Sequence, residues 1–225
     1  MRILIAGTDT DIGKTHVAAA LLAQARLSGH SCLGLKPVAA GADYDQGQAY
    51  SEDAARLANG AGYTGPLAAI NPTLLIEPIA PHIAADRVGL ELSAAAIASW
   101  AQDKAQGHDR VLLEGAGGWR VPLNRHESFA DIAKHLNWSV VLVVGMRLGC
   151  INHALLTAEA IQADNCHLAG WVANRVDPNQ SAYQENLTSL VERMPAPLLG
   201  QVPYGPRDPE AAAQFVSWPA KVRRS

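Results

Sequence analysis

Residues suited to hold a phosphate group lie near the start of the sequence. Gly13, Lys14 and Thr15 close a polar segment that follows Arg-Ile-Leu-Ile-Ala and precedes an Ala- and Leu-rich stretch. A turn that leads into a helix directs backbone N–H groups and the positive end of the helix dipole at one place, where a phosphate is stabilised. The Lys14 ammonium can pair with terminal phosphates, and the Thr15 hydroxyl can ligate Mg²⁺. The segment therefore predicts a nucleotide phosphate site.

The spacing of this segment departs slightly from that of the usual P-loop. Four residues normally separate two glycines before the Lys and Ser/Thr pair. Here Thr8 stands at the position of the first glycine, and Gly7 precedes it. The alternative is an ordinary strand-to-helix turn with an incidental Lys-Thr pair. The place of the segment, directly after the first expected strand, favours the phosphate-binding interpretation.

Two carboxylates and a second lysine can complete such a site. Glu114 follows Val-Leu-Leu at the carboxyl end of an expected buried strand, and Lys36 ends another strand before a proline. Ligands bind at this edge of doubly wound sheets. Asp53 opens an expected helix, where it can supply a Mg²⁺ ligand or be an ordinary first-turn acid. Lys36 alone is equally compatible with a solvated surface lysine.

Small residues follow Glu114. Gly115-Ala116-Gly117-Gly118 allows the backbone to approach a ligand closely, although a plain turn has the same composition. The run is not a dinucleotide fingerprint, because Arg120 stands where the third glycine belongs and no helical pattern begins there.

The elements that must position these residues alternate along the chain. Short apolar runs separate longer segments of helical period, which predicts an α/β fold of the P-loop NTPase type: a doubly wound, mainly parallel sheet with helices on both faces. We expect one domain over residues 1–225, with fraying after about residue 215, a loop at 43–51 and an ordered excursion at 61–81. Strands are expected at 2–6, 31–35, 110–113, 139–144, 167–173 and 198–202, and helices at 15–27, 52–58, 94–105, 129–136, 152–162, 183–193 and 209–214.

The composition narrows the function classes. Lys and Arg number 18 against 21 Asp and Glu, a net charge of -3, so no basic surface indicates nucleic-acid binding. No apolar run approaches the ~18 residues of a membrane span, and the apolar start is too short for a signal peptide, so we expect a cytoplasmic protein without a membrane partner. Cys32, Cys150 and Cys166 lack disulfide or metal-ligand spacing and are expected to be buried thiols.

Five motifs in a fixed order carry a resemblance to a known family. They are Gly-Thr-Asp-Thr-x-x-Gly-Lys-Thr at 7–15, Lys-Pro-Val-Ala at 36–39, Glu-Gly-Ala-Gly-Gly-Trp at 114–119, Leu-Gly-Cys-Ile-Asn-His-Ala at 148–154 and Gly-Trp-Val-Ala-Asn at 170–174. From about residue 2 to about residue 210 the chain resembles the dethiobiotin synthetases. The resemblance implies a homodimeric enzyme of biotin synthesis that uses ATP and Mg²⁺ to close 7,8-diaminopelargonic acid with CO₂ into dethiobiotin.

The resemblance also implies residue roles. Catalysis is assigned to Thr10, Lys14 and Lys36, and Mg²⁺ binding to Thr15, Asp53 and Glu114. Nucleotide binding is assigned to Asp11, Ile12, Gly13, Lys14, Thr15, His16, Asp53, Glu114, Gly115, Ala116, Gly117, Asn174, Arg175, Pro203, Tyr204, Gly205 and Glu210. Substrate binding is assigned to Lys36, Ala40, Gly117 and Gly118, and to a helix start supplied by the partner subunit at the positions of Leu148, Gly149, Cys150 and Asn152.

Some positions leave alternatives open. Ala40 stands where many members of the family have Ser, and Asn186 where a tyrosine is common. Asn174-Arg175-Val176-Asp177 is similar to the Asn-Lys-x-Asp motif with which GTPases recognise guanine, so GTP remains an alternative to ATP. Asn152 alone is equally compatible with a helix cap, and Trp119, Trp138 and Trp171 are interpreted as core residues.

Two other functions share the phosphate-binding residues. A dimeric ATPase switch that positions division sites or plasmids has the same fold, but such proteins carry an additional lysine early in the loop, where this chain has Asp9. Another P-loop ligase or a small-molecule kinase would keep Lys14 and Thr15 and bind a different acceptor.

Overall fold

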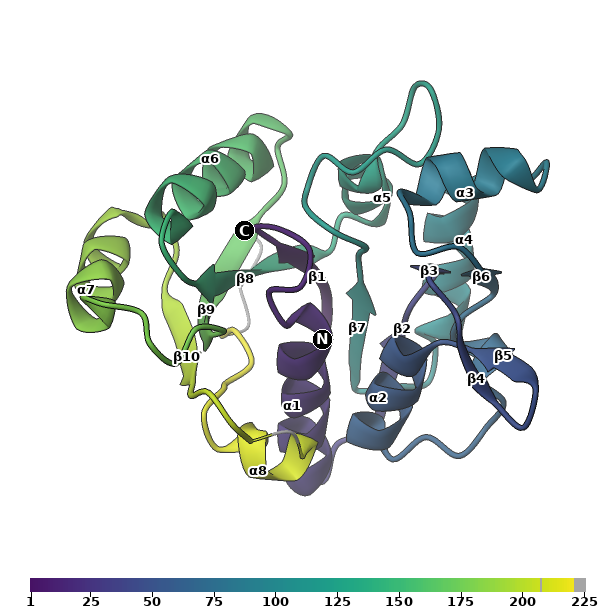
Figure 1. Cartoon of the computed structure of the whole chain (residues 1–225). Coiled ribbons are helices and arrows are strands. Elements are labelled where there is room, and N and C mark those ends of the chain that lie inside the picture. Colours follow the sequence, from purple (N-terminus) through teal and green to yellow (C-terminus); the bar gives the residue numbers. More distant parts are fainter. Residues whose placement is uncertain (207, 221–225) are drawn as a thin grey trace.

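A six-stranded parallel sheet forms the centre of the protein. The computed structural model describes residues 1–206 and 208–220. The strand order is β10-β9-β8-β1-β7-β2, and every neighbouring pair is parallel (Figure 1). The strands are β1 (Arg2–Gly7), β2 (Cys32–Leu35), β7 (Arg110–Glu114), β8 (Ser139–Met146), β9 (Leu168–Arg175) and β10 (Leu198–Val202). The predicted doubly wound α/β fold is confirmed.

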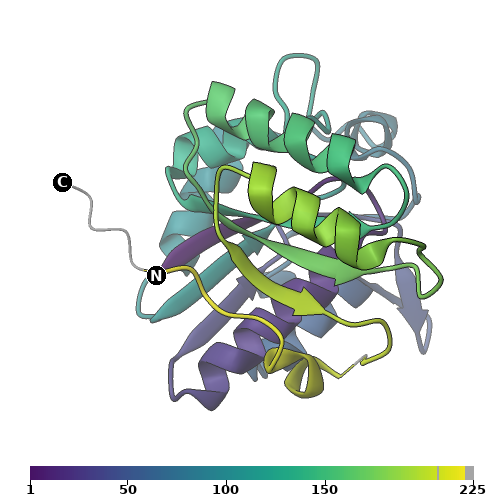
Figure 2. The ribbon, with the colours of Figure 1, turned by 90° about the vertical axis from the view of Figure 1, so that its left-hand side faces the viewer.

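Helices cover both faces of this sheet. Seen from the side, α6 and α7 lie on one face, and α1 and α8 lie on the other (Figure 2). The helix α2 packs on α1 and on the edge strand β2, while α4 and α5 pack together on the face opposite α1. Their bounds are α1 (Lys14–Leu27), α2 (Glu52–Ala61), α4 (Ala94–Lys104), α5 (Phe129–Leu136), α6 (Cys150–Ala163), α7 (Tyr183–Arg193) and α8 (Pro209–Ala213).

The strand side chains alternate between two apolar cores. In β1, Ile3 and Ile5 join the core under α1, whereas Leu4 and Ala6 join the core under α4 to α7. This alternation follows from the two-residue period of a strand. Because both faces are covered, every side chain of β1 from residue 3 to residue 6 is apolar and buried.

The expected loop at 43–51 contains a β-hairpin. The antiparallel strands β4 (Asp43–Asp45) and β5 (Gln48–Tyr50) are joined by Gln46 and Gly47, both with positive φ. Two such residues form the tight turn whose twist matches paired strands. The hairpin was not predicted because its side chains are mostly exposed, with Tyr44 at 62%, so it carries no buried-face alternation.

The segment 61–81 is ordered, as expected, and contains a 3₁₀ turn, a short strand and the start of a helix. A 3₁₀ turn, η1 (Leu67–Ala69), precedes β6 (Thr73–Leu75), which pairs in parallel with β3 (Val38–Ala40). The buried Asn71 side chain fixes this segment by donating to the Lys36 carbonyl at 2.7 Å and the Thr73 carbonyl at 3.2 Å. A helix, α3 (Pro81–Arg87), begins at Pro81, where a first-turn proline is favourable.

The helices α1 and α2 approach each other closely at Gly60. A Cβ atom on Gly60 would lie 2.5 Å from the Ala19 carbonyl oxygen of α1. Since α1 carries Thr15 and α2 carries Asp53, this contact sets the relative position of two candidate site residues.

Residues after α8 return to the domain. Val216 forms a bridge with Gly200 in β10, and the Trp218 indole N–H donates to the Leu21 carbonyl at 2.8 Å. The structure therefore places residues 216–218 against the sheet and α1, although fraying was expected from about residue 215. The part of that tail at 221–225 lies outside the described residues. Among the described helices, none has the length and apolar character needed to cross a bilayer.

Two of the three cysteines and three of the tryptophans are buried as expected, whereas Cys166 is not fully buried. Cys32 and Cys150 are buried, Cys166 is half-buried, and all three thiols are free. Trp119, Trp138 and Trp171 are buried in the core under α4 to α7.

Candidate active site

The phosphate loop between β1 and α1 has a backbone that requires glycine. Gly13 caps α1 with φ +80°, and a Cβ atom there would lie 2.1 Å from the Asn174 side-chain nitrogen. That amide donates to the Ile12 carbonyl at 2.8 Å and joins the loop to β9. Because the first-turn N–H groups of a helix have no acceptor within it, those of α1 are available to a ligand.

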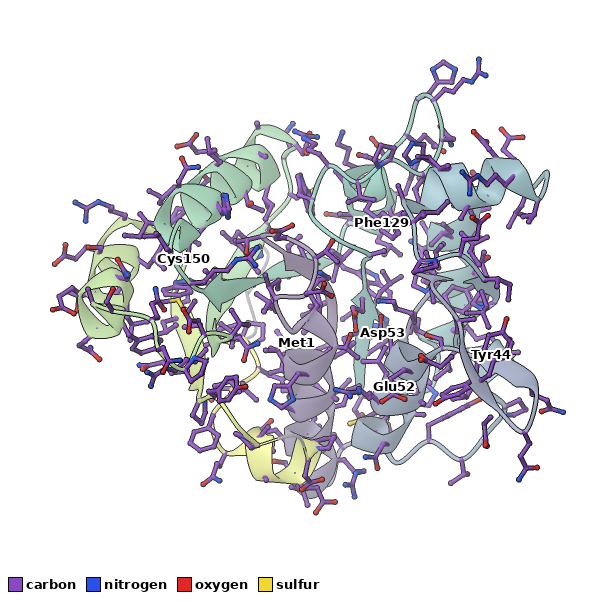
Figure 3. The ribbon with its side chains drawn as sticks, in the orientation of Figure 1. Met1, Tyr44, Glu52, Asp53, Phe129 and Cys150 are labelled. Atoms are coloured by element: carbon purple, nitrogen blue, oxygen red, sulfur yellow. The ribbon has the colours of Figure 1, made fainter. Side chains whose placement is uncertain are left out.

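Four side chains from four elements meet at the start of α1. The Thr15 hydroxyl lies 2.7 Å from Asp53 Oδ1 and 2.8 Å from Glu114 Oε1. The Lys36 ammonium lies 2.6 Å from Glu114 Oε1 and 2.7 Å from Asp53 Oδ2. Figure 3 shows Asp53 at the start of α2, on the side toward α1. Lys36 and Glu114 are both buried, and Glu114 accepts from Thr15 in the first turn of α1.

This cluster fits a hard divalent cation. One Thr15 hydroxyl carries one proton, so it can satisfy only one of the two carboxylate oxygens beside it. Among the described residues, the buried Glu114 Oε2 has no hydrogen-bond partner. A hydroxyl and two carboxylates are the oxygen ligands that Mg²⁺ takes alongside nucleotide phosphates. Thr15, Asp53 and Glu114 are therefore the residues that could hold the ion.

Burial and charge shift the pKa values of these groups. Burial opposes the charge on Lys36, but the carboxylates of Glu114 and Asp53 outweigh it and raise its pKa. Burial raises the pKa of Glu114 despite Lys36. Asp53 has its pKa lowered, because Lys36 outweighs the effect of burial. Burial lowers the pKa of Lys14 to about 8.

The cluster forms the floor of a cleft of about 800 Å³. Thr10 and Lys14 line its phosphate-loop side, and the Lys14 ammonium donates to the Asp9 carbonyl at 2.7 Å. Ala40, Ala116 and Gly117, which the resemblance assigns to substrate or nucleotide binding, also line this cleft.

A second cleft of about 640 Å³ adjoins the first. It is lined by Asn174 and Arg175 at the end of β9 and by the loop after β10. The predicted loop residues Pro203, Tyr204 and Gly205 all line it. The two clefts share Asp11, Gly13, His16 and Arg56, so they form one continuous surface around the phosphate loop.

The segment Asn174-Arg175-Val176-Asp177 is similar in sequence to the guanine-binding motif of GTPases, but the Asp177 side chain does not lie where that motif needs its acid. Asp177 Oδ1 accepts from the Asn179 backbone N–H at 2.8 Å, and Asp177 is not among the residues that line the second cleft. An acid that reads guanine must face the base.

Some predicted nucleotide residues lie away from the cleft walls. Glu210 pairs with Arg26 at 2.5 Å and lines neither cleft. The Ile12 side chain is buried and offers only its backbone. Gly115, and Gly118 from the predicted substrate residues, are also absent from both walls, although the Gly115 carbonyl lies 3.5 Å from the Lys36 ammonium.

The start of α6 is outside both clefts of its own chain. Leu148 is 94% exposed, whereas the Cys150 side chain is buried against Gln180. Gly149, with φ +93°, caps the helix, so Asn152 lies in its first turn as an exposed residue and does not act as the cap. The predicted substrate residues at this helix start are not brought to the Lys36 cluster within one chain.

Sequence reasoning missed several residues of the cleft walls. Arg56 lines both clefts, and Val121 and the segment 78–81 line the first. Arg56 could have been proposed from the sequence, because it lies three residues after Asp53 and such residues share a helix face. The segment 78–81 had none, because its place depends on the pairing of β3 with β6.

Comparison with known proteins agrees with this geometry. A family model described as an AAA domain matches residues 1–208. The ATP-dependent dethiobiotin synthetase BioD of Aromatoleum aromaticum is 52% identical over 200 residues, which cover 89% of each chain. The chain belongs to the dethiobiotin synthetase family. The BioD of Cellvibrio japonicus is 53% identical and covers 88% of this chain and 87% of that one.

Solved structures show the fold at much lower identity. MinD of Aquifex aeolicus, in its complex with MinC, has a TM-score of 0.57 at 14% identity over 98% of each chain. Chloroplast FtsY of Physcomitrella patens has a TM-score of 0.58 at 18% identity, and the match covers 92% of this chain and 60% of that one. These matches support the P-loop NTPase fold alone. Membership of the dethiobiotin synthetase family confirms the predicted enzyme class, an ATP-dependent ligase, over the ATPase-switch alternative.

Proposed function

We propose that this member of the dethiobiotin synthetase family joins CO₂ to 7,8-diaminopelargonic acid and closes the ring to dethiobiotin, with ATP converted to ADP and phosphate. The observation that carries the proposal is the buried Lys36–Glu114 pair at the phosphate loop, with Thr15 and Asp53 within hydrogen-bond distance. The relatives named for this activity, about half identical over most of their length, support it.

The first step in this proposal is carbamate formation. The lone pair of a neutral substrate amine attacks CO₂ to form the N–C bond, and the proton that the amine loses passes to water. A nearby ammonium lowers the pKa of the substrate amine by like-charge repulsion and stabilises the carbamate anion. Lys36 lies at the floor of the cleft and can fill both roles, lowering the pKa of the substrate amine and stabilising the carbamate, because its raised pKa keeps it positively charged.

The next two steps consume ATP and close the ring. A carbamate oxygen attacks the γ-phosphorus, and ADP leaves. The second amine then attacks the carbonyl carbon of the mixed anhydride, and phosphate leaves. Such transfer depends on positioning and on stabilising spread negative charge. Lys14 and Lys36 both line the cleft and supply positive charge there, and Thr10 lines the phosphate-loop side together with Lys14.

Magnesium is part of the proposal. Held by Thr15, Asp53 and Glu114, it would neutralise charge on the phosphate oxygens. Lys36 contacts the same two carboxylates, so its position is coupled to theirs.

A homodimer is proposed because the start of α6 does not reach its own cleft. Leu148 and Leu156 are large apolar residues of this helix region that are 94% and 56% exposed. A second copy that covers them could bring the N–H groups of the α6 first turn to the substrate carboxylate. Ala40 and Asn186 would then leave that carboxylate with fewer side-chain partners or with water.

One incubation tests the activity. Protein, ATP, Mg²⁺, bicarbonate and diaminopelargonate should give a product with the mass of dethiobiotin, together with ADP. Lys36→Gln should lower both carbamate occupancy and phosphoryl transfer, whereas Lys104→Gln, an α4 substitution outside both clefts, should leave them unchanged. Hydrolysis of ATP with no dethiobiotin would contradict the proposal. Carbamate at normal occupancy in Lys36→Gln would contradict the role of Lys36 in the first step.

Mixed dimers test the shared site. Lys36→Gln and Leu148→Asp variants, each nearly inactive alone, should regain activity when mixed, because one site of the mixed dimer keeps both an intact lysine and an intact α6 start. No recovery in a mixture shown to form heterodimers would contradict a shared site.

A further inference from the structure

Arg56 lies where the two clefts meet. It is one of four residues that line both, with Asp11, Gly13 and His16. The other three belong to the phosphate loop and the first turn of α1, whereas Arg56 belongs to α2. It is therefore placed to contact a ligand that passes from one cleft to the other.

The guanidinium of Arg56 is held at one end. Its Nε donates to Glu52 Oε1 at 2.8 Å, and the side chain is 45% exposed. Figure 3 shows Glu52 and Asp53 together at the start of α2. Among the described residues Glu52 is the only partner of this guanidinium, so the two terminal nitrogens remain available. A guanidinium held in this way presents a planar pair of donors to an oxyanion.

The positive charge of Arg56 acts on His16, in the first turn of α1. Burial lowers the pKa of His16, and the positive charge of Arg56 lowers it further. Arg56 also lines both clefts together with His16 in the first turn of α1, whose backbone N–H groups favour anions. It is absent from the cluster of Lys36, Asp53 and Glu114, so it is separate from the cations that serve the terminal phosphate.

This inference rests on the proposed use of ATP. A nucleotide with its terminal phosphates at Lys14 and its base in the second cleft must cross the shared surface, and the atoms that cross belong to the α-phosphate and the ribose. We infer that Arg56 binds the α-phosphate of the nucleotide with its two terminal guanidinium nitrogens. The residue positions ATP and does not take part in the transfer of the γ-phosphate.

The expected effect follows from the chemistry of the pair. Charge-assisted hydrogen bonds contribute more than neutral ones, but the exposure of Arg56 reduces their net value. Replacing Arg56 by Ala should weaken nucleotide binding roughly tenfold, within a range of about 5- to 20-fold. The loss should shrink as NaCl is raised, because exposed charges are screened.

A series of ligands that differ by one phosphate tests the assignment. Dissociation constants of ATP, ADP, AMP and adenosine are measured at pH 7 and low salt for the wild type and Arg56→Ala. An α-phosphate contact weakens ATP, ADP and AMP by the same factor and leaves adenosine unchanged. Arg56→Lys, which keeps the charge without the fork, should recover part of the affinity. Arg193→Ala removes a similarly exposed arginine from α7 and should bind every ligand like the wild type.

Other outcomes overturn the inference. Equal affinities of Arg56→Ala and Arg193→Ala would mean that Arg56 contacts no nucleotide. A loss of affinity for ATP alone would indicate that Arg56 contacts the γ-phosphate. An equal loss of affinity for adenosine would indicate that it contacts the ribose or the base. A wild type that binds none of the four ligands would instead overturn the proposed function, which separates the two failures.

Discussion

The phosphate loop offers a sharp test of the structure, because two glycines share one backbone conformation in different surroundings. Gly13 has φ +80°, and a Cβ added there would clash with the Asn174 amide, whereas Gly29, just after α1, has φ +82° with nothing within 4 Å of an added Cβ. Gly29→Ala should incur only the backbone term, about 1–2 kcal/mol. Gly13→Ala should incur that term and also displace the Asn174 amide from the buried Ile12 carbonyl, a further 1–3 kcal/mol or so.

The difference between the two variants is the measured quantity. Urea unfolding should give Gly13→Ala a free energy of unfolding about 1–3 kcal/mol below that of Gly29→Ala. The corresponding difference in Tm is about 2–4 °C per kcal/mol for a chain of this size. Gly29→Ala should bind ATP like the wild type, and Gly13→Ala should lose binding with its loop geometry.

A double variant identifies the cause. In Gly13→Ala with Asn174→Ala the amide that would clash is gone, so the combined loss of stability should be smaller than the sum of the single losses. Strict additivity, or a Gly13→Ala variant no less stable than Gly29→Ala, would refute the proposed contact between the loop and β9.

Three further outcomes are expected. Because the pKa of Lys14 is lowered to about 8, the free protein loses this charge as the pH rises through 8, so affinity for ADP should fall toward tenfold per pH unit above that value; Lys14→Ala should bind more weakly and show no such slope in titration calorimetry. Glu114→Gln should raise the Mg²⁺ concentration for half-maximal activity on the order of 10–100-fold, since it removes a charged ligand and leaves Lys36 paired with Asp53; an unchanged Mg²⁺ dependence would exclude Glu114 as a ligand. The kcat/KM for ATP should exceed that for GTP, because Asp177 is bonded to the Asn179 N–H and does not line the base cleft; a preference for GTP would contradict this interpretation.

Much of the fold could be read from local pattern. The buried strands β1, β7 and β8 are apolar on both faces, and their sequence runs predict them directly. The hairpin of β4 and β5 and the pairing of β3 with β6 could not be read in this way. Their side chains are exposed, or the strands are three residues long and pair across more than thirty residues.

The same division holds for the site. Lys14, Thr15, Lys36 and Glu114 were predictable because each stands at the end of a strand or the start of a helix, and parallel strands bring those ends to one edge. Arg56 shares a helix face with Asp53, three residues earlier, but a charged residue inside a helix ordinarily faces solvent. The packing of α2 on α1 is needed to show that this face lines a cleft.

The close contact between α2 and α1 at Gly60 also affects the position of the proposed magnesium ligand Asp53, although Gly60 is not in the site. Asp53 and Gly60 are seven residues apart on α2, or about 10 Å along the helix. A side chain as small as a methyl group at Gly60 would push α2 away from the Ala19 backbone and carry Asp53 with it. The spacing between two proposed magnesium ligands is thus set by a residue that touches neither of them, and a substitution far from the nucleotide can mimic the loss of a ligand.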